Sequence, residues 1–178
     1  MNSVLNTARL ILRPPLAEDF DAWAAFCAED EAMRFLGGVK SRPMAWRNFC
    51  TVAGSWDLYG FGYFSVIERE TGHWLGRVGP WRPDGWPGTE VGWGLTSAAT
   101  GHGFALEAAA AAIDWAFEIL EWEQVIHCIE PENVASIRLA ERLGATYRYE
   151  TEMPPPLDGH VTHVYAQDRA AWRRLGSS

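Results

Sequence analysis

The sequence predicts an α/β fold in which helices flank both faces of a mixed, mostly antiparallel sheet. Apolar runs at 61–68 and 73–80, joined by a Gly-containing turn, predict a β-hairpin, and a further strand follows at 89–95. A strand–helix–strand unit over 89–129 has the size of a parallel crossover. The 178 residues fit a single domain, 1–178.

The residues before the hairpin predict one strand and two helices. Thr7 to Arg13 alternates in polarity and is ended by prolines, which indicates a first strand. A second helix is expected over about 43–57, begun by Ser41 and a proline. The first helix, over 17–29, gathers on one face Phe20, Trp23, Ala24 and Cys27.

The residues after the hairpin change to helical periodicity. The helix at 101–120 has an apolar face and an acidic face, and a short strand follows at 124–129. Asn133 caps a further helix that Gly144 closes. The remaining elements are expected to be strands at 145–152 and 160–167 and a terminal helix at 168–175.

Net charge and composition limit the kinds of partner that this protein is expected to bind. The net charge is −8 and the pI about 5.1, with no basic stripe, so nucleic acid is not an expected partner. An acidic surface favours cationic ligands such as amines, although it equally serves solubility. Three separated cysteines and a short apolar N-terminal run predict a cytoplasmic protein without disulfides or membrane association.

The stretch SAATGHGFALEA at 97–108 places two glycines directly before a helix. A helix N-terminus has unpaired N–H groups and the positive end of its dipole, so it binds anions. Gly101 and Gly103 would permit close approach of a phosphate, but a plain turn explains them equally well. The P-loop string is absent, and Leu106 replaces the third glycine of a dinucleotide motif.

Four motifs occur together in order: T-x-R-L-x-L-R at 7–13, EVGWGL at 90–95, TGHGFALEA at 100–108, and P-x-N-x-x-S leading to Leu-Gly at 131–144. They resemble the GNAT N-acetyltransferase family, in its RimJ/RimL-like branch. The resemblance implies the GNAT acyltransferase fold, with acetyl-CoA bound where two neighbouring parallel strands diverge. It also implies direct acetyl transfer to a primary amine of a small molecule or a protein N-terminus.

The resemblance assigns the acetyl-CoA contacts mainly to backbone. Amides of the glycine loop would bind the pyrophosphate, and amides of the strand before it would align the pantetheine and stabilise the oxyanion. Ala98 stands where relatives carry Gln or Arg. The residues concerned are Trp93, Gly94, Leu95, Ala99, Thr100, Gly101, His102, Gly103, Phe104, Ala105, Asn133 and Ser136.

Two side chains are candidates for the chemistry. Glu90 matches a glutamate proposed as the base in the family; the alternative is a half-exposed strand residue without a catalytic part. Ser136 would lie beside the sulfur and hydrogen-bond the departing thiolate. Many relatives carry a tyrosine acid where this chain has Ala140. Together with Ala98, this leaves open a non-catalytic CoA-binding or regulatory module.

Other residues leave alternatives open. Trp81, Trp86 and Trp93 suit a wall of the acceptor pocket, a contact in a homodimer, or packing at the sheet edge. His102 would touch a phosphate or face solvent. Cys128 lies in an apolar strand without an activating base, so a covalent intermediate is not expected, and neither is a metal site.

Overall fold

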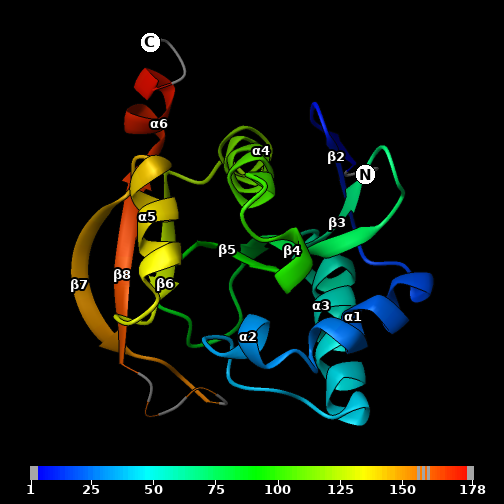
Figure 1. The fold of residues 1–178 in the computed structure, drawn as a ribbon. Coiled ribbons are helices and arrows are strands. Elements are labelled where there is room, and N and C mark those ends of the chain that lie inside the picture. Colours follow the sequence, from blue (N-terminus) through cyan, green and yellow to red (C-terminus); the bar gives the residue numbers. More distant parts are fainter. Residues whose placement is uncertain (1–3, 156, 158, 160, 176–178) are drawn as a thin grey trace.

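The computed structural model describes residues 4–155, 157, 159 and 161–175 and contains an eight-stranded sheet (Figure 1). The strand order is β1-β2-β3-β4-β5-β6-β8-β7. The pair β5–β6 is parallel and the other neighbours are antiparallel. The strands are β1 Leu5–Asn6, β2 Leu10–Arg13, β3 Phe64–Glu68, β4 Trp74–Trp81, β5 Glu90–Leu95, β6 Gln124–Ile129, β7 Thr146–Glu152 and β8 Val161–Asp168.

Helices cover both faces of this sheet, as the sequence predicts. The long helix α4 packs on β2, β4 and β5, whereas α1 and α3 lie together on the opposite side (Figure 1). The α4 side buries an alanine-rich helix surface against Val and Leu side chains, and the other side buries a cluster of aromatic rings. The helices are α1 Phe20–Phe26, α2 Asp30–Met33, α3 Arg42–Tyr59, α4 Phe104–Glu118, α5 Val134–Arg142 and α6 Arg169–Leu175.

The helix predicted over 17–29 is present, but its first turn is a 3-10 helix and it ends at Phe26. The segment forms a 3-10 turn at Ala17–Asp19 followed by α1. Asp19 accepts hydrogen bonds from Arg13, from Ser65 and from the N–H of Leu16, and these contacts tie the turn to the sheet. Side-chain contacts at one residue therefore position the start of this helix against the sheet.

Two predicted strands are also shorter than expected. Residues 7–13 do not form one strand, because Thr7 closes a turn between β1 and β2 by bonding Leu10. The strand at 61–68 begins only at Phe64. The carbonyls of Phe61 and Tyr63 accept hydrogen bonds from α3 side chains instead of pairing in the sheet. Of the strand predicted at 160–167, residue 160 lies outside the described residues.

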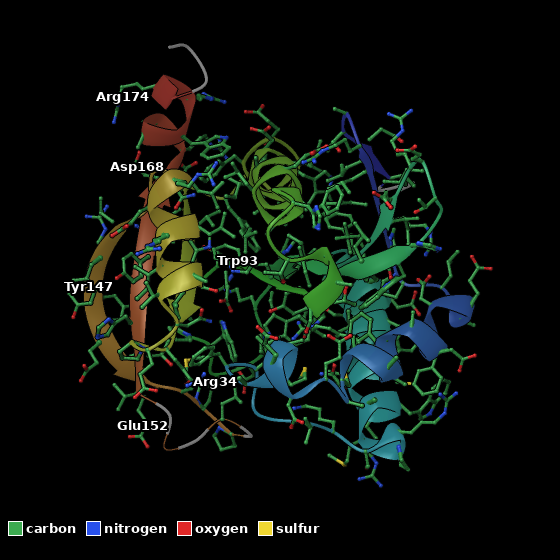
Figure 2. The ribbon with its side chains drawn as sticks, in the orientation of Figure 1. Arg34, Trp93, Tyr147, Glu152, Asp168 and Arg174 are labelled. Carbon is green, nitrogen blue, oxygen red and sulfur yellow. The ribbon has the colours of Figure 1, made fainter. Side chains whose placement is uncertain are left out.

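The arrangement leaves a space beside β5 that positions the site. Trp93 on β5 lies in the space between the central strands and α5 (Figure 2). The terminal helix α6 is tied to α4 by a hydrogen bond from Trp172 Nε1 to Asp114. None of the helices in the described ranges combines the length and apolar character that a membrane crossing needs.

Candidate active site

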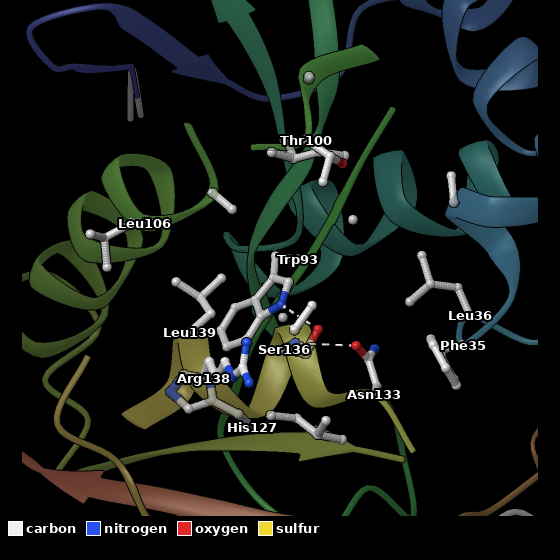
Figure 3. A pocket seen from close by; sticks show the side chains of 18 of the residues that line it. Phe35, Leu36, Trp93, Thr100, Leu106, His127, Asn133, Ser136, Arg138 and Leu139 are labelled. Atoms are coloured by element: carbon white, nitrogen blue, oxygen red, sulfur yellow. Dashed lines mark hydrogen bonds between the residues drawn. The ribbon is translucent and has the colours of Figure 1, made fainter. Parts of the chain in front are cut away.

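A cavity of about 540 Å³ opens where β5 and β6 separate (Figure 3). Its walls come from β5, the glycine loop, the start of α4, the end of β6, and α5, with α2 and its following loop across the opening. Of the residues predicted for the site, those lining it are Glu90, Trp93, Gly94, Leu95, Ala99, Thr100, Gly101, Gly103, Phe104, Ala105, Asn133 and Ser136. Residues from three separate motifs, at 90–95, 100–108 and 131–144, thus meet at one cavity.

The glycine loop leads into the N-terminus of α4. Gly101 and Gly103 have φ of +86° and +79°, in the left-handed region where a side chain is strained. Nothing lies within 4 Å of a side chain built at Gly101, so the loop surface there is open. The first N–H groups of α4 have no intrahelical partners. Loop and helix therefore present unpaired donors toward the cavity.

The N-terminal motif fixes this loop from behind. Arg9 Nη1 donates to the carbonyl of His102 over 2.9 Å, and its Nε donates to Glu107 over 2.7 Å. Thr7 Oγ1 also donates to Glu107, over 2.6 Å. Partial burial opposes ionisation of Glu107, but the bonds from Thr7 and Arg9 outweigh it and lower its pKa. The turn between β1 and β2 therefore anchors both ends of the loop–helix junction.

His102 is the exception among the predicted residues. It does not line the main cavity, and its exposed ring stacks beside Phe104 with centroids 5.9 Å apart, over a separate shallow hollow. Its carbonyl is occupied by Arg9. Only its backbone N–H therefore stays a candidate for contact with a phosphate.

Glu90 is buried, with 5% of its surface exposed, so its description as a half-exposed strand residue is wrong. Trp86 Nε1 donates to its Oε2 over 2.6 Å, and the N–H of Cys128 donates to its Oε1 over 3.0 Å. Burial raises the pKa of Glu90 to about 7, although both bonds and the charge of Arg77 act against this. A carboxyl group with that pKa exchanges protons readily near neutrality.

Asn133 and Ser136 form the start of α5. Asn133 Oδ1 caps the helix by accepting from the N–H of Ser136 over 3.1 Å. The amide NH₂ of Asn133 is then free to donate elsewhere. Ser136 Oγ accepts from Trp93 Nε1 over 3.1 Å (Figure 3). Ala140 is fully buried, so the position of the family's tyrosine lies in the core of this chain.

Gly92 and Gly94 alternate with Trp93 along β5, so they lie on the same face of the strand as Glu90. A side chain at Gly92 would come within 2.6 Å of the Tyr63 hydroxyl, and one at Gly94 within 2.8 Å of Leu36. Tyr63 lines the cavity, with Trp81 stacked on its ring at 5.1 Å and Arg77 over it at 4.1 Å. The glycines of EVGWGL thus make room for an aromatic wall beside Glu90.

Other polar groups have structural partners. Burial, and then the charge of Glu90, raise the pKa of the Cys128 thiol, which makes it a poor nucleophile. His127 is buried between Val91 and Gln167, and burial lowers its pKa to about 4. No group of three or more metal-ligating side chains gathers anywhere in the described part of the chain.

The structure adds residues that sequence reasoning missed. Tyr63 and Leu36 line the cavity without belonging to a motif considered for it, and Arg138 lines it from a variable position of the motif at 131–144. Arg9 and Trp86 do not line the cavity, but Arg9 holds the glycine loop and Trp86 bonds Glu90. The family motif T-x-R signalled the first of these, but its link to the loop spans 93 residues between Arg9 and His102 and is visible only in three dimensions.

Comparison with known proteins agrees with this architecture. Residues 9–146 match the family model described as an acetyltransferase (GNAT) domain. The uncharacterized N-acetyltransferase p20 of Bacillus licheniformis is 30% identical over 142 residues, which cover 78% of this chain and 80% of that protein. The uncharacterized protein YkkB of Bacillus subtilis is 33% identical over 91 residues, and the match spans about half of its length, 53%.

A solved acetyltransferase structure has the same fold as this chain. The crystal structure of an acetyltransferase from Agrobacterium tumefaciens superposes with a TM-score of 0.84 at 32% identity. The match covers 95% of this chain and 96% of that one. By its domain match, its relatives and its fold, the chain belongs to the GNAT family of acyl-CoA-dependent acetyltransferases.

Proposed function

We propose that this chain is a single-domain N-acetyltransferase of the RimJ/RimL-like branch, which transfers acetyl from acetyl-CoA directly to a primary amine. The acceptor is a small molecule or a protein N-terminus. One observation carries the proposal: the strands β5 and β6 separate beside Glu90 and Ser136, and the resulting cavity runs to the donor-rich start of α4. The cavity thus combines an anion-binding helix N-terminus, the slot between β5 and β6 where the strands separate, and two polar side chains.

The backbone geometry supports the assignment of acetyl-CoA contacts. Thr89, just before β5, and Val91 in β5 direct their carbonyls toward β6, and peptide groups two residues apart face the same edge. The N–H groups of Trp93 and Leu95 therefore face the widening gap. They are suited to align a pantetheine amide and to stabilise an oxyanion, while amides at about Ala99–Ala105 would hold the pyrophosphate.

The side chains support the proton transfers. Acetyl-CoA supplies the thioester, with its thiolate as the leaving group. Glu90 would accept a proton from the amine, directly or through water, since its pKa lies near 7. Ser136 would donate a hydrogen bond to the thiolate rather than its proton, because a serine hydroxyl is a weak acid. Asn133 would hold the pantetheine arm with its free NH₂ group.

Calorimetry with acetyl-CoA tests the cosubstrate. Gly101→Phe and Gly72→Phe form a matched pair, because both glycines have left-handed φ, of +86° and +74°, and open space around them. Only Gly101 borders the cavity. Micromolar binding that Gly101→Phe loses and Gly72→Phe keeps supports the site. Absence of binding by the wild-type protein at millimolar acetyl-CoA would reject it.

Turnover with a panel of amines tests the reaction. Release of CoA thiol that depends on an amine, and that falls at least tenfold in Glu90→Gln, is the expected result. Tight binding without turnover of any amine would favour the non-catalytic CoA-binding module instead.

A further inference from the structure

One backbone hydrogen bond is missing where the two parallel strands separate. The N–H of Ile126 donates to the carbonyl of Thr89 over 2.9 Å, which sets the register of β6 on β5. In a regular parallel ladder the next bond in this direction joins the N–H of Cys128 to the carbonyl of Val91. Here the N–H of Cys128 and the carbonyl of Val91 do not bond each other, and each bonds a side chain instead.

The two replacement partners are the neighbours of the broken pair. The N–H of Cys128 donates to Glu90 Oε1 over 3.0 Å, and the carbonyl of Val91 accepts from His127 Nδ1 over 2.7 Å. Glu90 precedes Val91 on β5, and His127 precedes Cys128 on β6. Buried backbone groups without partners are costly, so these two side chains make the separation of the strands stable.

The His127 ring is held in one protonation state. Burial leaves it neutral, so a ring that donates through Nδ1 has an acceptor at Nε2. Gln167 Oε1 lies 3.1 Å from Nε2, and the amide nitrogen of Gln167 is buried without a partner. Exchanging the two amide atoms, which the electron distribution of an amide barely distinguishes, lets the nitrogen donate to Nε2. Gln167 thereby fixes the tautomer that donates to Val91.

We propose that His127 is a positioning residue for acetyl-CoA: its Nδ1–H occupies the Val91 carbonyl and so keeps β6 from closing onto β5. The proposal rests on the proposed function, since it takes the slot between the strands as the pantetheine site. The ring also lies against Trp93, with centroids 4.8 Å apart, at the floor of the cavity (Figure 3). Loss of the donor lets the N–H of Cys128 return to Val91 and narrows the slot.

Two substitutions separate the hydrogen bond from the shape of the ring. His127→Phe keeps an aromatic ring but has no donor, whereas His127→Asn is smaller and keeps an N–H near the Nδ1 position. Calorimetry on the full chain should show acetyl-CoA binding about tenfold weaker in His127→Phe and within about threefold of wild type in His127→Asn. Val125→Ala, a buried change on the same strand that removes no hydrogen-bonding side chain, controls for destabilisation.

Equal affinity of His127→Phe and wild type would overturn the proposal, as would equal losses in His127→Phe, His127→Asn and Val125→Ala. If His127→Phe does not fold, Gln167→Met keeps the ring but releases its tautomer, and about threefold weaker binding is expected. Unchanged affinity in Gln167→Met then contradicts the proposal.

NMR on the ligand-free protein makes this test independent of the proposed function. A scalar coupling across a hydrogen bond between Cys128 N and the Val91 carbonyl carbon should be absent in wild type and present in His127→Phe. If wild type binds no acetyl-CoA but this coupling appears in the variant, the proposed function fails while the role of His127 in the strand separation stands. A coupling already present in wild type overturns that role.

Discussion

Trp93 Nε1 donates a hydrogen bond to Ser136 Oγ over 3.1 Å and so joins β5 to the first turn of α5. An indole N–H is only a donor, so the serine oxygen is the acceptor in this pair. The hydroxyl hydrogen of Ser136 is then left for another acceptor. Because Ser136 lines the cavity, this hydrogen is available to a thiolate that develops there.

Ser136→Ala should lower kcat about tenfold and leave the KM for acetyl-CoA within about twofold, since the bond strengthens only as negative charge develops on sulfur. Trp93→Phe keeps a ring against His127 but removes the donor, and should lower kcat about threefold. Steady-state kinetics of both variants and the double variant measure the coupling. Additive losses in the double variant would show that Trp93 does not act through Ser136.

Glu90 should set the acidic limb of the pH profile. Burial raises its pKa to about 7, so kcat/KM is expected to rise with pH through that value as the carboxylate forms. Glu90→Gln should lose most activity and also lose this limb. The comparison with wild type uses one acceptor throughout, so that the titration of the amine itself is common to both profiles. An identical limb in Glu90→Gln would assign it to another group.

The same shift has a consequence for stability. A carboxyl group whose pKa is raised on folding binds protons more tightly in the folded state than in the unfolded state. The stability that Glu90 contributes is therefore fully present below the unfolded pKa of about 4.5 and is lost as the pH rises to about 7. The free energy of unfolding of wild type should therefore fall by about 3 kcal/mol relative to Glu90→Gln across that window. Urea unfolding at several pH values measures the difference. A constant difference between the two proteins would contradict the raised pKa.

The sequence contains much of this site but not its connections. Glu90, Gly103, Asn133 and Ser136 were predicted because each belongs to a local motif, and local motifs depend on residues close together in the chain. The separation of the strands could be expected only through the family resemblance. Its cause, a reciprocal exchange of partners between β5 and β6, depends on register, which periodicity does not supply.

The errors in the fold have the same origin. The predicted helix at 17–29 has the correct apolar face, with Trp23, Ala24 and Cys27 buried. Its first turn is nevertheless a 3-10 helix, in which Asp19 is bound by Arg13 and by Ser65, which is 46 residues away. Glu90 likewise meets a residue from another strand, since the N–H of Cys128, 38 residues away, donates to its Oε1. Contacts between distant residues decided each case, and composition alone does not encode them.

Arg9 should affect acetyl-CoA binding without touching it. Its guanidinium holds the His102 carbonyl and Glu107, so Arg9→Gln is expected to raise the KM for acetyl-CoA about fivefold, by loosening the loop, with kcat nearly unchanged. Arg42→Gln is the control, because Arg42 is another exposed arginine that binds a carboxylate, that of Asp21, on the opposite side of the sheet from the loop. Equal effects of the two variants would show that the loop does not depend on Arg9.

The Tyr63 hydroxyl oxygen should be the atom that prevents a side chain at position 92. A Cβ at this position would lie 2.6 Å from the Tyr63 hydroxyl oxygen and 3.2 Å from the nearest ring carbon. Gly92→Ala is therefore expected to cost about 1–3 kcal/mol of unfolding free energy through overpacking. In a Tyr63→Phe background the closest atom is gone, so the same change should cost less than half as much. Denaturant unfolding of the four proteins of this cycle measures the coupling, and equal costs in both backgrounds would show that the hydroxyl is not what excludes a side chain from β5.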